Sequence, residues 1–288
     1  MKRSKGENVF NVINIIALTM ISVVMLYPFL YVVGASLSDP DEVAAGAVWL
    51  MPKGITLSSY LEVLNYKGIW MAYGNTLFYV VAGTLISMVV TMCGAYPLSK
   101  RRLRGGGIIT FLVAFTMWFN AGMIPTYLNL KDLHLLNSRI GILVFGCVSA
   151  FYVFIMRTYF ASIPDSLEES ARIDGANDWR IMVQIYLPLS IPCIATLTLY
   201  YIVDRWNGYF WAMILLKDES KIPLQVLLNK LIVQSGLSGE TDMTTDSTFN
   251  QQTLVYTTIV VSVLPVLCAY PFLQKYFVKG VMVGAIKG

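Results

Sequence analysis

Long stretches of this chain carry no Asp, Glu, Lys or Arg, and short charged segments separate them. Five uncharged runs cover residues 8–38, 68–99, 105–130, 181–203 and 247–274, and a sixth, of 17 residues, covers 140–156. A helix needs about 20 apolar residues to cross a hydrocarbon core of about 30 Å. The five longer runs meet this length, and the sixth is apolar enough to be counted with them. Because lipid offers no partner to backbone polar groups, such runs are predicted to be helices.

The pattern therefore predicts an all-α, polytopic membrane protein, with one transmembrane domain over residues 1–288. Six transmembrane helices are expected: Phe10–Val33, Tyr73–Leu98, Ile108–Leu130, Ile140–Phe160, Ile191–Leu216 and Thr253–Gln274. The composition agrees, because 56% of the residues are hydrophobic and 13% are charged, whereas soluble domains have about 25% charged residues. The spans leave two extracellular loops, residues 36–67 and 217–252, and one sizeable cytosolic loop, residues 161–189.

The basic residues predict the orientation. With the N-terminus inside, 13 Lys and Arg fall in cytosolic segments and seven in outer segments. Since Lys and Arg are enriched on the cytosolic side, both termini are predicted to be cytosolic. The net charge of +4 then reflects topology and indicates no nucleic-acid partner. The alternative that the first span is a cleaved signal is disfavoured, because its apolar part exceeds the usual 7 to 15 residues.

Sequence signals for catalysis are lacking. His134 is the only histidine and the four cysteines fall singly in separate apolar runs, so neither a histidine-based metal site nor a catalytic triad is predicted. There is no GxxxxGK[ST] phosphate loop, and the RGGG at residues 104–107 lacks the Lys and Ser or Thr that would complete one. We expect no enzyme activity, no metal and no cofactor bound by this chain.

The segment Glu168–Pro188 is unusually polar for this chain. Pro164 suits a first helical turn, and Ser166 with Glu169 fits a capping box. Leu167 and Ala171 lie four residues apart on one face of the predicted helix. Glu168, Arg172 and Asp174 are expected to point away from that face.

Gly175 is a predicted left-handed stop after this first helix. A second helix is expected to begin near Asp178, with Ile181 and Ile185 in register, and to end before Pro188. One interpretation is a loop that only connects two spans. The paired amphipathic helices favour the other, an element that docks another protein.

The spacing of this segment resembles the EAA signature of permease subunits of bacterial ABC importers. The matching residues are Glu169, Ala171, Gly175 and, after nine residues, Ile185, Leu187 and Pro188; Ser170 stands where Ala is usual. The stretches MIPTYLNLKDLHLLNS, RWNGYF, IPLQVLL and YFVKGVMVGAIKG extend the resemblance over nearly the whole chain. Together they are similar to MalG-like carbohydrate permeases, especially the subgroup for complex oligosaccharides and aldouronates.

The resemblance implies the fold of an ABC type I importer permease in the bacterial plasma membrane, with a core transport domain at residues 73–278. The EAA loop, between helices 4 and 5, would be the coupling helix: Glu169 would contact a cytosolic ATPase dimer, Ala171 would pack in its cleft and Gly175 would permit the bend. The C-terminal tail, with Gly284, Lys287 and Gly288, would also reach the ATPase. ATP and Mg would be used by that partner. A second permease subunit, an extracytoplasmic solute-binding protein and an oligosaccharide complete the expected partners.

The fifth predicted span contains Asp204 and Arg205 in an otherwise apolar helix. Ionisable groups at such depth mark a pathway by default, since they are costly unless they face a cavity or a partner. At helical spacing one stripe holds Tyr200, Asp204, Asn207 and Trp211, and its neighbour holds Tyr201, Arg205 and Gly208. The first stripe is predicted to line the substrate pathway; the alternative is an aromatic belt at the membrane interface.

Three roles stay open for Arg205: pairing with Asp204, holding another helix, or meeting an acidic sugar. Two other classes of function also stay open. An ion-coupled secondary transporter could use Asp204 and Arg205 as a relay, although no internal repeat is evident. A membrane receptor or scaffold could use the Glu168–Pro188 segment to dock a cytosolic protein.

Overall fold

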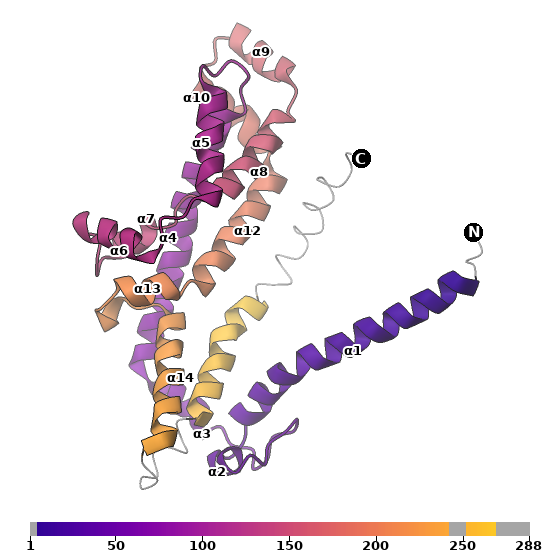
Figure 1. The fold of residues 1–288 in the computed structure, drawn as a ribbon, viewed down its shortest axis with the longest axis vertical. Coiled ribbons are helices and arrows are strands. Elements are labelled where there is room, and N and C mark those ends of the chain that lie inside the picture. The colour runs from indigo at the N-terminus through magenta and orange to yellow at the C-terminus, as the bar shows by residue number, and fades with distance from the viewer. Residues whose placement is uncertain (1–4, 242–251, 269–288) are drawn as a thin grey trace. The chain divides into compact units, whose positions relative to one another are not determined.

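The computed structural model describes residues 5–241 and 252–268, and the regular structure among them is entirely helical (Figure 1). In order, the helices are α1 (Lys5–Ser36), α2 (Pro40–Ala44), α3 (Ser58–Asn65), α4 (Lys67–Leu98), α5 (Gly106–Trp118), α6 (Met123–Asp132), α7 (Arg139–Val144), α8 (Ala150–Ala161), α9 (Asp165–Ile173), α10 (Asp178–Ile181), the π-helix η1 (Met182–Tyr186), α11 (Leu187–Leu189), α12 (Ile191–Asn207), α13 (Phe210–Leu215), the 3-10 helix η2 (Glu219–Lys221) and α14 (Leu224–Thr241). A further apolar helix covers Gln252–Cys268.

The described residues divide into two compact units: residues 5–70 with 227–241 and 252–265, and residues 71–226 with 266–268. The first unit contains α1, an apolar helix long enough to span a membrane and without buried residues in its most hydrophobic window. A small core forms at the end of α1, where Ala35 packs with Val43 and Val48. Tyr31 meets Tyr256 edge to face, with ring centroids 5.7 Å apart, a favourable geometry for aromatic rings.

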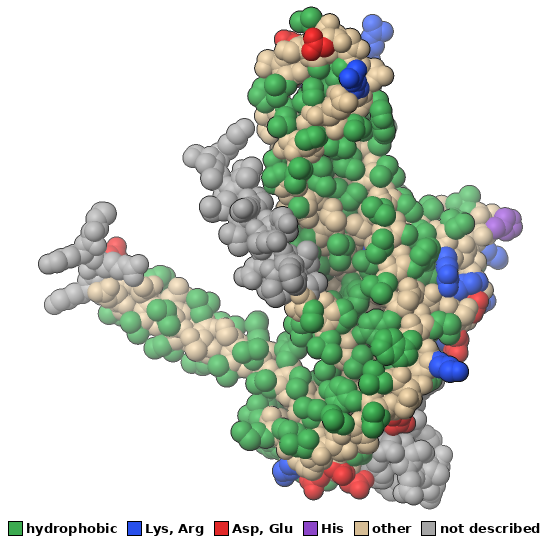
Figure 2. Space-filling view, turned by 180° about the vertical axis from the view of Figure 1, so that it is seen from behind, with side chains coloured by type: hydrophobic (Ala, Val, Ile, Leu, Met, Phe, Trp, Pro, Cys, Tyr) green, Lys and Arg blue, Asp and Glu red, His purple; other side chains and the backbone are tan. Residues whose placement is uncertain are grey.

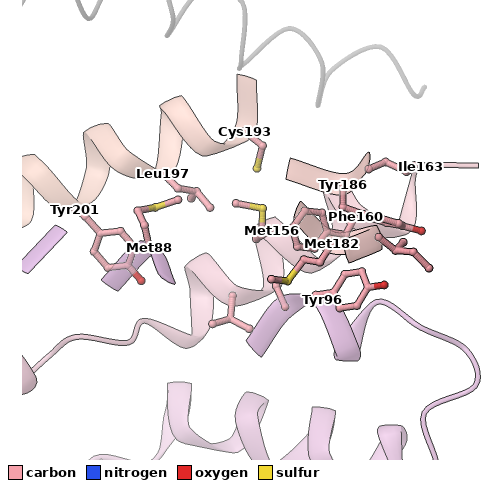
Figure 3. Close-up of a cluster of buried hydrophobic side chains, with 13 residues drawn as sticks. Met88, Tyr96, Met156, Phe160, Ile163, Met182, Tyr186, Cys193, Leu197 and Tyr201 are labelled. Carbon is pink, nitrogen blue, oxygen red and sulfur yellow. The ribbon is translucent and has the colours of Figure 1, made fainter. Parts of the chain in front are cut away.

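The second unit contains the main core, built by α4, α8, the α10–η1 segment and α12 (Figure 3). Tyr96, Phe160 and Tyr186 form its centre, with all three ring pairs edge to face and centroids 5.2–6.3 Å apart. Such pairs contribute about 0.5–1.5 kcal/mol beyond the area they bury. Met88, Met156 and Leu197 continue the core along the helices.

Large apolar side chains also cover the outer flanks of these helices (Figure 2). On α4 they include Leu77, Val81 and Leu85, and on α5 they include Ile108 and Phe111. An apolar surface of this extent requires lipid or a protein partner. Within residues 5–241 and 252–268, two helices are long and apolar enough to cross a membrane, or up to four if each bent pair is one span.

Three predicted spans are wrong as single straight helices. The span Ile108–Leu130 consists of α5 and α6, which meet at 116°. Asn120 and Gly122 make this bend: the Asn120 side chain accepts a hydrogen bond from the Gly122 backbone N–H at 2.8 Å, and Gly122 has φ +89°. Side chains other than Gly rarely adopt that backbone angle.

The spans Ile140–Phe160 and Ile191–Leu216 are interrupted for similar reasons. The first is α7 followed by α8, with Gly146 at φ +66° in the connection. The second is α12 followed by α13, with Gly208 extended at φ −70° and ψ 93°. In lipid, such breaks need protein or a water-lined cavity around them.

Two other predictions of extent are also changed. Residues 217–252, expected as a loop, contain η2 and the 18-residue helix α14. The predicted last span Thr253–Gln274 is helical as far as Cys268, and its remaining residues lie outside the described part.

Candidate functional site

The segment Glu168–Pro188 folds as two helical pieces joined by a tight bend, as expected. Here residues 165–189, from α9 to α11, are called the cassette; in Figure 1, α9 lies beside α10 at one end of the second unit. Gly175 has φ +80° at the bend, and the Ala176 N–H donates to the Ala171 carbonyl at 2.9 Å. Asn177 caps α10 by accepting the Arg180 N–H at 2.9 Å. The left-handed stop at Gly175 and the helix start at Asp178 are therefore confirmed.

Two details of the predicted cassette are wrong. The capping box is absent, because Pro164 is the N-cap without a side-chain bond and Ser166 lies inside the first turn of α9. The second helix does not end before Pro188 but continues to Leu189. Residues Met182–Tyr186, just before the proline, form a π-helix. In a π-helix the backbone hydrogen bonds join residues five apart instead of four.

Glu168 was expected to point away from the face of Leu167 and Ala171. It is buried, with 8% of its surface exposed. Its carboxylate pairs with Lys100, with Arg172 at 3.0 Å and with Arg102 at 3.3 Å. The hydroxyl of Tyr186 donates to it at 3.1 Å. The face of α9 that carries Glu168 therefore turns toward the α4–α5 turn, residues 99–105, which provides two of these cations.

The charges around Glu168 determine its protonation. Burial raises the pKa of the Glu168 carboxyl, but the bonds from Lys100, Arg172 and Tyr186 outweigh burial, so the pKa lies below its ordinary value of 4.5. Burial lowers the pKa of the Lys100 ammonium, which Glu168 opposes. We regard the pair as ionised, because three cationic groups surround one carboxylate.

Asp178 extends this network to α10, because it pairs with both Arg102 and Arg172. We call the five residues the Glu168 network: Lys100, Arg102, Glu168, Arg172 and Asp178. A cavity of about 450 Å³ lies beside the network. Its lining comes from the end of α4, the α4–α5 turn and the α10–η1 segment, and includes Cys93, Pro97, Leu103, Trp179 and Met182.

The predicted coupling residues fall into two groups. Glu169, Gly175 and Pro188 are exposed, and a Cβ on Gly175 would meet no atom within 4 Å. Ala171, Ile185 and Leu187 instead pack against the core of their own unit. The second group therefore fixes the cassette from inside.

Two exposed apolar residues beside the bend were missed by the sequence interpretation. Ile173 is 87% exposed and Trp179 is 63% exposed, one on each side of Gly175. Exposed apolar side chains that stand among charged residues are candidates for contact with another protein. The one sequence signal that could have identified them is their position near Gly175: Ile173 comes two residues before it and Trp179 four residues after it.

A second site lies where α12 ends. A cavity of about 360 Å³ is lined there by Asp204, Asn207, Tyr209, Trp211 and, from other elements, Tyr79 and Ser149, among others. Asp204 accepts a hydrogen bond from Tyr152 at 2.8 Å. Three residues of the predicted pathway stripe, Asp204, Asn207 and Trp211, are thus brought to one cavity.

The other predicted pathway aromatics are placed differently. Tyr200 does not line this cavity but stacks on Tyr152, with ring centroids 5.7 Å apart. Tyr201 lies in the core, where its hydroxyl shares a 2.7 Å hydrogen bond with Thr91, and only part of it reaches the cavity. For Tyr201 the physical reason is that its stripe of α12 faces α4 and α8, where it contacts Thr91 and Tyr152.

Arg205 holds another helix, which was one of its three open roles. Its guanidinium donates to the carbonyls of Ile142 at 2.7 Å, Leu143 at 3.2 Å and Phe145 at 3.3 Å, at the C-terminal end of α7. Among the described residues, no ion pair joins it to Asp204. A cation is favoured where a helix leaves carbonyls without partners.

Gly83 on α4 makes room for this arrangement. A Cβ at Gly83 would lie 2.9 Å from Nε of Arg205, closer than real Cβ contacts. No local pattern could indicate this contact, because Gly83 and Arg205 are far apart along the chain.

A polar stripe on α4 fixes the segment that leads into α14. Asn75 donates to the carbonyls of Ser220 at 2.8 Å and Ile222 at 3.1 Å, and accepts from Arg139 at 2.9 Å. Tyr79 donates to the Lys221 carbonyl at 2.8 Å. These bonds hold the segment that closes one side of the cavity.

Gly284, Lys287 and Gly288 of the predicted C-terminal contact lie outside the described residues. In the part of the chain that is described, no group of three or more His, Cys, Asp or Glu could hold a metal ion.

Apolar flanks, a polar helical bend and a broken helix beside a cavity are features of membrane transport subunits. Residues 68–283 match the family described as binding-protein-dependent transport system inner membrane component, and the chain belongs to this family. It is a permease component of an ABC transporter and not an enzyme.

The relatives cover nearly the whole chain. The polygalacturonan/rhamnogalacturonan transport system permease protein YtcP of Bacillus subtilis (strain 168) is 41% identical over 94% of this chain and 96% of its own length. The protein LplC of the same organism is 36% identical, over 100% of this chain and 98% of its own.

Solved structures agree with the fold. A chain of a bacterial ABC transporter involved in the import of the acidic polysaccharide alginate has a TM-score of 0.88 and 45% identity, covering 96% of this chain and 99% of its own. A second chain, from an alginate transporter in complex with a pentasaccharide-bound periplasmic protein, has a TM-score of 0.59 at 16% identity. It is similar in fold alone.

Proposed function

We propose that this chain forms half of the translocation pore of an ATP-driven importer for oligosaccharides that contain uronate residues. The observation that carries the proposal is the likeness to a chain of an alginate importer, at TM-score 0.88 and 45% identity over 96% of this chain. The similarity to a permease for polygalacturonan and rhamnogalacturonan supports it. Alginate and polygalacturonan are both polymers of uronic acids, so the shared chemistry is a carboxylate-bearing sugar.

The cassette, in the cytosolic loop at residues 161–189, would couple this chain to an ATPase dimer that uses ATP and Mg. Glu169 is exposed beside the bend, and Ile173 and Trp179 offer apolar surface. Ala171, Ile185 and Leu187 pack on the core and would hold these groups in place. The resemblance to the EAA signature supports this assignment.

The cavity at the end of α12 would belong to the sugar pathway. Asp204 and Asn207 offer hydrogen-bonding groups and Tyr209 and Trp211 offer flat faces, which are the two kinds of contact that sugars use. Arg205 is not assigned to the uronate, because its NH groups already bond to three backbone carbonyls.

Transport would follow alternating access in the plasma membrane, with both termini in the cytosol. Closure of the ATPase dimer would move the cassette, and this chain and a second permease subunit would rock to open the cavity outward. An extracytoplasmic solute-binding protein would deliver the oligosaccharide there, and hydrolysis would reset the system.

Uptake of labelled oligosaccharides tests this function. In cells that lack the chromosomal copy, the wild-type chain should restore uptake of oligogalacturonate but not of a neutral oligosaccharide of equal length. Uptake should stop when ATP is depleted while the proton gradient is kept. Uptake that follows the gradient instead would favour the ion-coupled alternative, and ATPase binding without uptake of any sugar would favour a scaffold.

A further inference from the structure

Two adjacent glutamates on α9 have opposite surroundings. Glu169 is exposed, whereas Glu168 is buried against the α4–α5 turn and pairs with Lys100 from that turn. Along the chain, the cassette is covalently connected to α8 at one end and to α12 at the other. Contact with α4 therefore depends on side chains: Tyr96 of α4 packs on Tyr186 of η1, and the Glu168 network joins α9 and α10 to the turn at the end of α4.

The Lys100–Glu168 pair is enclosed. The side chain of Lys100 is 9% exposed and that of Glu168 is 10% exposed. The Lys100 ammonium also lies 3.6 Å from the ring centroid of Tyr186 and 4.5 Å from that of Tyr96. Because both side chains are largely shielded from bulk water, loss of one partner would leave the other uncompensated, which is more costly than loss of an exposed pair.

Arg102 joins the same turn to both halves of the cassette. It pairs with Glu168 on α9 and with Asp178 on α10. Arg172 closes the network within the cassette, because it pairs with the same two carboxylates. The two cassette helices and the turn thus share one set of charges.

Apolar packing between the turn and α10 is incomplete. The cavity of about 450 Å³ lies between them and is lined by Leu103 on one side and by Trp179 and Met182 on the other. Side chains across such a gap lose their dispersion contacts. The ion pairs are therefore the direct link between the turn and α10.

We propose that Glu168 is a positioning residue that fixes the α4–α5 turn to both cassette helices, so that a movement of the cassette is passed directly to α4. The inference rests on the proposed coupling of the cassette to an ATPase. Glu168 itself contacts neither the sugar nor the ATPase. Its role is to make α4 move with α9 and α10, in addition to the covalent routes through α8 and α12.

The test separates positioning from stability in the complete complex, with the second permease subunit, the ATPase and the binding protein, reconstituted in liposomes. The variants are Glu168→Gln, the double variant Lys100→Met with Glu168→Gln, and the control Asp174→Asn, an exposed carboxylate of the same bend. The readouts are sugar transported per ATP hydrolysed, the melting temperature and the amount of ATPase that co-purifies.

Glu168→Gln should lower both the melting temperature and the transport per ATP, the latter about fivefold. The double variant should recover the melting temperature, because Lys100 is no longer stranded. Its transport per ATP should stay low, because the ion pairs between the α4–α5 turn and Glu168 on α9 are still missing. Asp174→Asn should match the wild type in all three readouts.

Two outcomes would overturn this inference alone: recovery of transport per ATP together with stability in the double variant, or loss of the ATPase from the Glu168→Gln complex, which would make Glu168 a docking residue. A wild-type complex without ATP-dependent uptake would overturn the proposed function and this inference with it.

Discussion

The cassette and the break after α12 are both polar interruptions of an apolar chain, but their charges are used differently. At the cassette, three cations and two carboxylates pair with one another, while Glu169, Ile173 and Trp179 stay exposed. At the break, the half-buried Arg205 bonds to backbone carbonyls, and it lines a cavity together with Asp204 and Asn207. In both places one charged side chain is held by groups of the protein itself, and residues near it are available for partners.

The largest effect is expected at Arg205, where the comparison predicts a loss of stability and not of recognition. Arg205→Met removes hydrogen bonds from a charged donor to the α7 carbonyls, each worth about 1.5–3 kcal/mol. The melting temperature of the purified protein should fall steeply. Gly83→Leu should have a similar effect, because its side chain would displace Nε of Arg205. An Arg205→Met protein with normal stability but altered sugar preference would contradict this role.

Gly175→Val should abolish transport while the protein still inserts into the membrane. The φ of +80° is unfavourable for a β-branched residue by about 1–3 kcal/mol, so the bend should change. Loss of uptake with normal membrane levels by immunoblot would support the assignment. The matched control is Gly107→Val, where a Cβ also meets no atom within 4 Å but φ is not positive; it should transport normally.

Asn207→Ala should reduce sugar uptake about two- to tenfold, since one hydrogen bond to a sugar hydroxyl is worth about 0.5–1.5 kcal/mol, and should leave stability unchanged. Asn207 is exposed in the cavity, which separates it from Arg205 two residues earlier. Uptake assays and thermal melting of the two variants side by side measure the difference. Unchanged uptake by Asn207→Ala would remove this residue from the pathway.

The smallest effect is the pH dependence of the cassette. Because the pKa of Glu168 is lowered from 4.5 in the folded protein, its contribution to stability is complete above pH 4.5 and is lost as the pH falls through the folded pKa. Hydrogen exchange of α9 should therefore accelerate below pH 4.5 in the wild type. Glu168→Gln should lack this acid-dependent step, and an identical profile in the two proteins would contradict it.

The sequence predicted the helical class, the apolar segments and the bend at Gly175, because these depend on local composition and on one residue without a Cβ. It did not predict the breaks near Gly146 and Gly208, since glycine also occurs inside intact membrane helices such as α4. Nor did it predict that Glu168 is buried and Arg205 is bonded to α7. Glu168 pairs with Lys100 and Arg205 bonds to Ile142, and each partner is more than 60 positions away along the chain. The periodicity of one helix does not indicate which distant residue a side chain will contact.

The most direct test of the central claim is a crosslink from the bend to an ATPase. In a cysteine-free background, Ile173→Cys would be compared with Lys217→Cys, an exposed position in the predicted outer segment, after gentle purification from native membranes. Mass spectrometry should find an ATPase in the crosslinked product of Ile173→Cys and not in that of Lys217→Cys. An ATPase that co-purifies but crosslinks equally to both positions, or a chain that purifies without any ATPase, would contradict the assignment of the cassette as the coupling element.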